Sequence, residues 1–232
     1  MVFSFKYIYF YLLSSLLRIV PGISFYNSKI CFHAKGSVFI AGGKSVDNYI
    51  ENIRSLDGLK FSVNYAALLD IDFDYLIIEP HWGIKHWCSE VAKKYKKSSC
   101  QQPIIILKSY YSPRKLILLF YTLFLFWRFK IKISVLPEIT DYDSFLYLKD
   151  KNFIILDHSN TLNYIFSLSF ACSFDSIIFY GFDFSQHYSS KINNTVSNLV
   201  NLVPKAQVIN KLNRHISFLK KVYGYNIDYK FK

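Results

Sequence analysis

The stretch SVFIAGGKSVDNYIENIRSLDGLKFSVN, which begins at Ser37, constrains the fold of this chain more than any other. Its order of residues predicts a short apolar strand, a tight turn through Gly42 and Gly43, a helix and a second strand. Ser45 or Asp47 can cap that helix, whose outward-pointing backbone N–H groups would attract phosphate. Nucleotide-binding sheets begin in this way.

The turn does not have the spacing of a known phosphate-binding loop. A Walker loop has four residues between its glycines and ends in Gly-Lys-Ser or Gly-Lys-Thr, and the dinucleotide fingerprint has three glycines. The alternative interpretation is that Gly42 and Gly43 only let the chain reverse between strand and helix. The elements that follow favour the nucleotide-binding interpretation.

Short β-prone runs recur along the chain, and helix-compatible stretches separate most of them. Because parallel neighbours need crossover connections, this alternation predicts an α/β fold, a Rossmann-like, mainly parallel sheet with helices on both faces. Helices are expected at residues 161–174 and 212–223. The predicted strands are Val38–Ala41, Phe61–Asn64, Tyr75–Glu79, Ile104–Leu107, Ile131–Leu136, Phe153–Leu156 and Ser176–Tyr180.

Ligands bind such sheets beyond the carboxyl ends of the strands. The polar residues at those positions are therefore the candidate site residues. They are Gly42 to Ser45, Asn64, Glu79 to His81, Asp157 to Asn160 and Gly181 to His187.

The composition favours a membrane surface as a partner. The chain of 232 residues carries a net charge of +12, while 52% of its residues are hydrophobic and 19% are aromatic. Anionic lipid is a natural counterpart for such a chain. Nucleic acid is the competing explanation, but no nucleic-acid-binding module is recognisable and the aromatic residues lie in apolar runs. The scattered cysteines form no metal-binding or disulfide pattern, which agrees with reduced thiols in the cytoplasm.

Two apolar segments are too short to span a bilayer, which takes roughly 20 residues. Tyr7–Val20 predicts an apolar helix within an N-terminal region, residues 1–35, that we expect to associate with the membrane. Leu116–Trp127 has basic flanks and predicts either a helix lying in the headgroup layer or a buried core helix. We expect residues 36–232 to form one domain, with residues 108–135 as a lid or membrane-docking insert. The expected location is peripheral, on the cytoplasmic face of the inner membrane.

Five pieces of the chain carry a family resemblance: VFIAGGKS, FSVNYA, IIEPH, DHSNTLNYIFSLSFA and SIIFYGFDF, of which the last is the most specific. Together they resemble the bacterial sialyltransferases that decorate lipooligosaccharide, and the wider clan of lipopolysaccharide-core Kdo transferases and pterin-pyrophosphorylating MptE-type proteins. The resemblance covers roughly residues 37–232. It implies a single Rossmann-like domain, a variant of the GT-A fold, with a small lid.

The resemblance also implies a CMP-activated sugar as the donor, with no metal and no separate cofactor. Gly42, Gly43 and Ser45 would lie near the donor phosphate, and Asn64 would match the family's Asn that contacts the nucleotide or the sugar. The implied donor-binding residues are Gly42, Gly43, Lys44, Ser45, Asn64, Ser159, Asn160, Gly181, Asp183 and Ser185.

The catalytic residues depart from the family pattern, because residues 203–210 (VPKAQVIN) lack the family's general-base His before the last helix. An acceptor hydroxyl must lose a proton as it attacks the anomeric carbon, and the best-placed substitutes are His187, His158 and Glu79. His187 is the first choice. Tyr188 beside it could protonate or hydrogen-bond the departing phosphate, a role also open to Lys191 through its charge.

The leading hypothesis is a membrane-associated glycosyltransferase that moves sialic acid, Kdo or a related acidic sugar from CMP to a lipopolysaccharide, lipooligosaccharide or capsule precursor. Its partners would be the nucleotide sugar, a glycan or glycolipid acceptor and an anionic membrane surface, with homo-oligomers also open and nucleic acid excluded.

Two alternatives stay open. One is a catalytically degenerate protein that binds a nucleotide or a glycan as a partner in polysaccharide assembly. The other is an MptE-like pyrophosphokinase, which would need magnesium and an acidic cluster. Asp70, Asp72 and Asp74 are close in sequence, but they are more typical of a solvated loop. The spacing of His81 and His86 does not predict a metal site.

Overall fold

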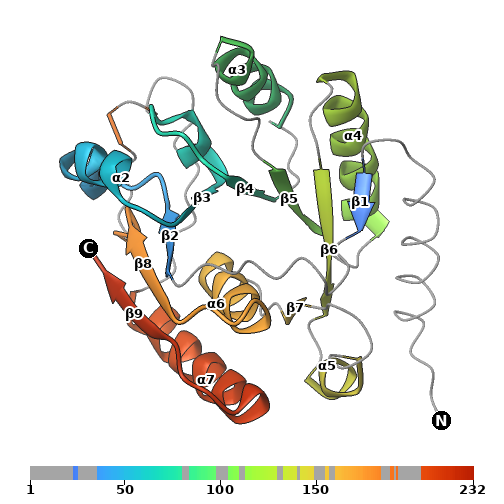
Figure 1. Cartoon of the computed structure of the whole chain (residues 1–232). Helices are drawn as coiled ribbons and strands as arrows, with labels where there is room; N and C mark the ends of the chain where they lie inside the picture. The colour runs from blue at the N-terminus through green and yellow to red at the C-terminus, as the bar shows by residue number, and fades with distance from the viewer. Residues whose placement is uncertain are drawn as a thin grey trace. The chain divides into compact units, whose positions relative to one another are not determined.

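The computed structural model describes residues 23–25, 36–79, 84–97, 104–109, 113–129, 133–139, 142–148, 155–156, 160–183, 189–190, 192 and 205–232 (Figure 1). The chain divides into two compact units. Unit 1 comprises residues 1–30 and 77–155, and unit 2 comprises residues 31–76 and 156–232. The apolar helix predicted at Tyr7–Val20 lies outside the described residues, and the domain boundaries expected from the sequence stay a prediction.

Unit 2 contains a parallel sheet in the order β3-β2-β8-β9, where β2 pairs with β3 and β8, and β8 pairs with β9. β4 lies next to β3, and the chain passes into unit 1 within β4. The strands are β2 (Gly36–Ile40), β3 (Leu59–Val63), β4 (Tyr75–Ile78), β8 (Ser176–Tyr180) and β9 (Asp228–Phe231). The helices of this unit are the 3-10 helices η1 (Lys44–Asn48) and η2 (Asn64–Leu68) and the α-helices α2 (Ile50–Ser55), α6 (Thr161–Ala171) and α7 (Lys205–Tyr223).

An aromatic row, formed by Tyr75, Phe61, Phe39, Phe179 and Phe231, crosses this sheet. The register places Phe39 opposite Phe61 and Phe179, and it places Phe179 opposite Phe231. Ring centroids are 4.6 Å apart for Phe39 and Phe61, 5.9 Å for Phe39 and Phe179, and 4.6 Å for Phe179 and Phe231. Tyr75 stacks on Phe61 at 4.9 Å. Residues opposite one another in paired strands point to the same face, so this register gathers the rings into one layer.

Helices cover both faces of the unit 2 sheet. α6 lies on the face of the aromatic row, where Phe166 contacts Phe179 at 5.4 Å between ring centroids. The next residue of β8, Tyr180, contacts Tyr49 between η1 and α2 at 5.3 Å. Because successive strand residues point to opposite faces, these two contacts lie on opposite sides of the sheet. The predicted Rossmann-like α/β architecture is confirmed.

The helix α6 is enclosed because it packs against both the sheet and α7. Its residues 162–170 are all buried. Ser167 Oγ donates to the carbonyl oxygen of Leu156 at 2.5 Å and lies 2.8 Å from Nε2 of the buried His215 on α7. Asn160 begins the helix, since its side chain accepts a hydrogen bond from the backbone N–H three residues later.

Unit 1 contains a second group of parallel strands, in the order β1-β6-β5. Its helix α3 packs against α4, where Trp87 and Phe126 meet edge to face with ring centroids 6.0 Å apart. The elements are β1 (Ile23–Phe25), α3 (Ile84–Lys97), β5 (Ile104–Ser109), α4 (Pro113–Phe129), β6 (Ile133–Ile139) and α5 (Tyr142–Leu148), and β7 (Ile155–Leu156) at the boundary of the units pairs with β6.

Most sequence predictions of secondary structure agree with the observed elements. Ser176–Tyr180 is confirmed at both ends, while the helix expected at residues 161–174 ends at Ala171 and the last helix begins at Lys205. Neither β1 nor β9 is among the predicted strands. All residues of β9 are exposed and its sequence is DYKF, so no apolar run marks it.

Among the described residues, no helix has both the length and the apolar character that crossing a membrane requires.

Candidate functional site

The carboxyl ends of β2 and β8 are locked together by backbone hydrogen bonds through two glycines. Ala41 N–H donates to the carbonyl oxygen of Tyr180 at 2.8 Å, and Gly43 N–H donates to that of Gly181 at 3.0 Å. A Cβ atom on Gly43 would lie 2.3 Å from the Gly181 oxygen. Gly181 has a φ of +73°, and a Cβ atom there would lie 2.4 Å from the Ala41 oxygen. Only glycine fits both positions, because the two backbones touch.

Asp183 supplies the cap of the helix that follows the glycine turn. Its carboxylate accepts a hydrogen bond from Ser45 N–H at 2.7 Å and a second one from the Ser45 hydroxyl. Gly43, the N-cap residue of η1, has no side-chain cap of its own. The expectation that Ser45 or Asp47 caps this helix is therefore wrong. The capping acceptor is the carboxylate of Asp183, which is 138 positions from Ser45 in the sequence.

Asp47 instead holds the segment that follows β8. Its carboxylate accepts hydrogen bonds from the Ser189 hydroxyl and from both the backbone N–H and the hydroxyl of Ser190, the latter two at 3.0 Å. Ser189 N–H also donates to the carbonyl oxygen of Gly42 at 2.8 Å. These bonds join residues 41–47 to residues 180–183 and 189–190 within unit 2. We call this hydrogen-bonded region the locked edge.

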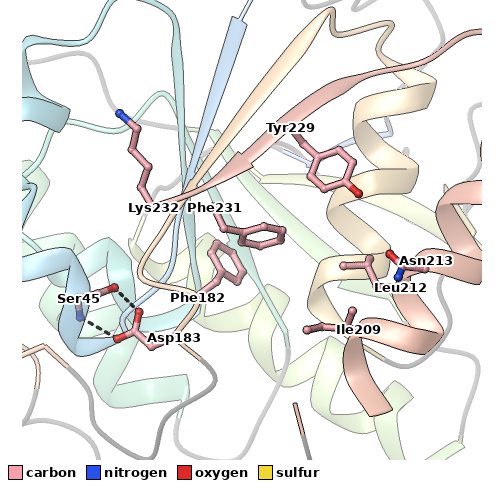
Figure 2. A pocket seen from close by; sticks show the side chains of 9 residues that line it. All are labelled: Ser45, Phe182, Asp183, Ile209, Leu212, Asn213, Tyr229, Phe231 and Lys232. Atoms are coloured by element: carbon pink, nitrogen blue, oxygen red, sulfur yellow. Dashed lines mark hydrogen bonds between the residues drawn. The ribbon is translucent and has the colours of Figure 1, made fainter. Parts of the chain in front are cut away.

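A pocket of about 540 Å³ borders this edge (Figure 2). This volume is within the range of small-molecule sites, roughly 300–1,000 Å³. The rings of Phe182 and Phe231 meet edge to face at 6.4 Å inside it. Figure 2 shows the Ser45–Asp183 pair at one end of the pocket, with Tyr229, Ile209, Leu212 and Asn213 toward the other end. Apolar rings beside a carboxylate and a hydroxyl are suited to the faces and hydroxyls of a sugar.

The fold brings half of the predicted donor-binding residues to this edge. Gly43 bonds to Gly181 and Ser45 bonds to Asp183, while Gly42 accepts a bond from Ser189 at the same edge. The N–H groups of Gly43 and Ser45 are already engaged, so a phosphate on either would have to displace a protein acceptor.

Three further predicted residues lie in unit 2. Lys44, the first residue of η1, is exposed. Asn64 is half-buried at the end of β3 with a φ of +52°, and the parallel pairing of β3 with β2 places it at the same edge of the sheet. Asn160 caps α6, which engages its side chain.

The described structure places only one of the predicted catalytic residues, so their arrangement stays a prediction. Glu79 is half-buried after β4 and belongs to unit 1. The other predicted residues lie outside the described residues and stay predictions: His158, Ser159, Ser185, His187 and Tyr188.

The acidic loop before β4 has a structural role. Asp70 forms an ion pair with Arg54, and Asp74 accepts a hydrogen bond from Lys60 N–H at 2.8 Å. Within the part of the chain that the structure describes, no group of three or more His, Cys, Asp or Glu side chains is arranged to hold a metal ion. Burial, reinforced by the charge of Asp74, raises the pKa of Tyr75 to about 12.

Sequence reasoning missed the aromatic lining of the pocket. Tyr229 and Phe231 belong to the unpredicted strand β9, and Phe182 lies within the GFDF motif between two predicted site residues. The alternation of aromatic residues in YKF was the available signal, because it places both rings on one face of a strand.

No protein family matches this chain, and no curated protein does. Solved structures do resemble it. The monofunctional alpha-2,3-sialyltransferase Cst-I of Campylobacter jejuni has a TM-score of 0.52 and 13% identity over 84% of this chain and 75% of that one. An apo alpha-2,3-sialyltransferase of the same organism has a TM-score of 0.50 and 14% identity over 84% of this chain and 74% of that one. The sialyltransferase CstII, in complex with the substrate analogue CMP-3FNeuAc, has a TM-score of 0.49 and 18% identity over 85% of this chain and 80% of that one. For the two alpha-2,3-sialyltransferases, at 13–14% identity, the likeness is one of fold, and it confirms the resemblance to bacterial sialyltransferases at that level.

Proposed function

We propose that this chain is a glycosyltransferase that transfers sialic acid, Kdo or a related acidic sugar from a CMP-activated donor to a glycan or glycolipid acceptor. The observation that carries the proposal is the locked edge beside an aromatic pocket, at the carboxyl ends of parallel strands in a sialyltransferase fold. Lipopolysaccharide, lipooligosaccharide and capsule precursors are the acceptors we propose, and no metal or cofactor enters the reaction.

The locked edge supports this function by fixing the backbone around the donor. A rigid edge positions a bound nucleotide without a further entropic cost at the moment of reaction. Exposed Lys44 then offers its ammonium to the donor phosphate, while Asp183 and Ser45 hold the turn in place. The net charge of +12 attracts an anionic donor.

The chemistry requires a base for the acceptor hydroxyl and a group to stabilise the leaving CMP. We assign the first role to His187 and the second to Tyr188, with His158 and Glu79 as alternative bases. As the acceptor oxygen bonds to the anomeric carbon, the bond to the CMP phosphate breaks and the hydroxyl proton passes to the base.

CMP binding and transfer can be measured separately on the full chain. We expect the purified protein to bind CMP in calorimetry and to release CMP from a CMP-sugar when a glycolipid acceptor is added. His187→Ala should slow transfer by about a hundredfold or more while CMP binding is unchanged. The matched control is His86→Ala, on the exposed face of α3. Absence of CMP binding at millimolar concentration would eliminate the proposal.

One observation favours the non-catalytic alternative, a nucleotide- or glycan-binding partner in polysaccharide assembly. The Asp183 carboxylate occupies the N–H of Ser45, where the sequence predicts donor phosphate. CMP or glycan binding without any transfer, under conditions where His187→Ala changes nothing, would support this alternative over the enzyme.

A further inference from the structure

Helix α4 has an exposed apolar stripe that unit 1 leaves uncovered. The stripe consists of Ile117, Phe120, Phe124 and Trp127, which are 64%, 47%, 54% and 59% exposed. Their spacing of three, four and three residues puts all four side chains on one helical face. Phe124 and Trp127 contact each other with ring centroids 6.2 Å apart.

The opposite face of α4 is already used for packing. Leu118, Leu123, Leu125 and Phe126 are buried, and Phe126 meets Trp87 of α3. The stripe is therefore a second apolar face on a helix that is anchored through its first. The buried-helix alternative that the sequence left open for this segment therefore holds for one face of α4, and the interfacial alternative concerns the other face.

The sequence that contains α4 is strongly basic, although Lys93 on the neighbouring helix α3 pairs with Glu90. From Val91 to Pro137 the sequence contains no Asp or Glu. Its ten cations account for most of the net charge of +12, and they are Lys93, Lys94, Lys96, Lys97, Lys108, Arg114, Lys115, Arg128, Lys130 and Lys132. Arg128, in the last turn of α4, is exposed next to the stripe.

We propose that the α4 stripe docks on an anionic lipid bilayer, with the helix lying in the plane of the interface. The stripe from Ile117 to Trp127 is about 15 Å long at 1.5 Å per residue, half the roughly 30 Å of a hydrocarbon core. Aromatic side chains on one face and cations at both ends are the features of an interfacial helix. Each cation near an anionic surface adds to the attraction. The docking does not depend on transferase activity.

Vesicle binding by the full chain tests the surface. We expect the protein to co-sediment with vesicles of phosphatidylcholine and phosphatidylglycerol, and to bind pure phosphatidylcholine much less. Raising the salt from about 0.1 M to about 1 M shortens the Debye length from about 10 Å to about 3 Å and should release the protein. Equal binding to both vesicle types at both salt concentrations would overturn the electrostatic part of the proposal.

A matched pair of variants tests the stripe itself. Phe124→Gln should weaken vesicle binding roughly tenfold, because the lost apolar burial is replaced by a polar group. Leu146→Gln on α5 changes a similarly exposed apolar residue, 43% exposed, outside the stripe and should leave binding unchanged. If Phe124→Gln instead lowers the sedimentation coefficient and binds vesicles normally, the stripe covers a second copy of the chain and the proposal fails.

Tryptophan fluorescence locates the contact. Trp127 is exposed on the stripe, whereas Trp87 is fully buried. Lipids with brominated chains should quench the bound protein, and Trp127→Phe, which keeps an aromatic ring on the stripe, should still bind while most of that quenching is lost. Equal quenching of the wild type and of Trp127→Phe would show that another segment inserts, and would overturn the assignment to α4.

Discussion

The sheet of unit 2 and one face of helix α4 in unit 1 use aromatic residues in opposite ways. In unit 2 the aromatic row stacks across a sheet, and Phe39, Phe61 and Phe179 are completely buried. In unit 1 the aromatic residues Phe124 and Trp127 of α4 are more than half exposed. The same residue types therefore build a scaffold where strands place them in register and a contact surface where a helix face lacks a neighbour.

The charged residues also differ between the units: acids make contacts within the chain in unit 2, and cations dominate one stretch of unit 1. Acidic side chains in unit 2 hold loops: Asp183 caps η1, Asp47 binds the segment after β8, and Asp74 accepts from Lys60. The stretch from Val91 to Pro137 in unit 1 has cations only. Pairing within the chain stabilises the edge of the candidate site. In unit 1 Lys93 pairs with Glu90, and the excess of cations over acids in this stretch is the charge that we propose an anionic surface balances.

The largest expected difference between the units comes from truncating one aromatic residue in each. Phe179→Ala should lower the free energy of unfolding by about 4 kcal/mol, because it leaves a cavity between Phe39 and Phe231. Phe124→Ala, on the exposed stripe, should change it by less than about 0.5 kcal/mol. Urea unfolding of the two variants measures both. Similar losses would mean that α4 is covered and would remove the contrast.

A pair of glycine substitutions tests the locked edge. Gly43→Ala should cost about 2–3 kcal/mol of unfolding free energy, since the new Cβ would meet the Gly181 oxygen at 2.3 Å. Gly36→Ala, in the same chain segment, places its Cβ no closer than 3.5 Å to Ser176 and should cost less than about 1 kcal/mol. Thermal unfolding distinguishes the two, and equal stability would show that the turn can open without cost.

Removal of the long-range cap should have a smaller effect. Asp183→Ala deletes both hydrogen bonds from Ser45 and should destabilise the chain by about 2 kcal/mol. The control Asp57→Ala removes an exposed carboxylate between α2 and β3. Hydrogen exchange should report faster exchange at the Ser45 amide in Asp183→Ala only. Unchanged protection there would contradict the capping role.

The smallest effect concerns pH. Burial, and then the charge of Asp74, raises the pKa of Tyr75 to about 12, so the unfolded chain loses this phenol proton at lower pH than the folded chain does. The neutral Tyr75 phenol therefore contributes fully to the free energy of unfolding below pH 10, and this contribution is lost as pH rises toward 12. Tyr75→Phe keeps the ring on Phe61 and should make alkaline destabilisation shallower. Melting temperatures measured from pH 9 upward check this, with Tyr229→Phe as the control. If the two variants lose stability alike as the pH rises, the role of Tyr75 is refuted.

Much of the fold could be predicted because its signals are local. Apolar runs that end in polar or glycine residues marked most of the strands, and Ser176–Tyr180 was placed at both ends. β9 could not be placed, because an edge strand with exposed side chains has no apolar pattern. The convergence of Gly43, Gly181 and Asp183 followed from one rule, that parallel strands end at a common edge.

The particular partners within that edge could not be predicted. Ser45 and Asp183 are 138 positions apart, and the sequence equally allowed Ser45 to bind a phosphate. The pocket depends on Phe231 meeting Phe182, which requires β9 to lie beside β8.

By itself, the sequence determined the alternation of strands and helices, the glycines at the turn and the concentration of positive charge, because each depends on residue type and near neighbours. Only the tertiary structure decided which acceptor satisfies Ser45 and which apolar face of α4 is left exposed. Those outcomes depend on atoms that are far apart in the sequence and meet only in the folded chain. A pattern of residue types does not specify which of several suitable partners makes the contact.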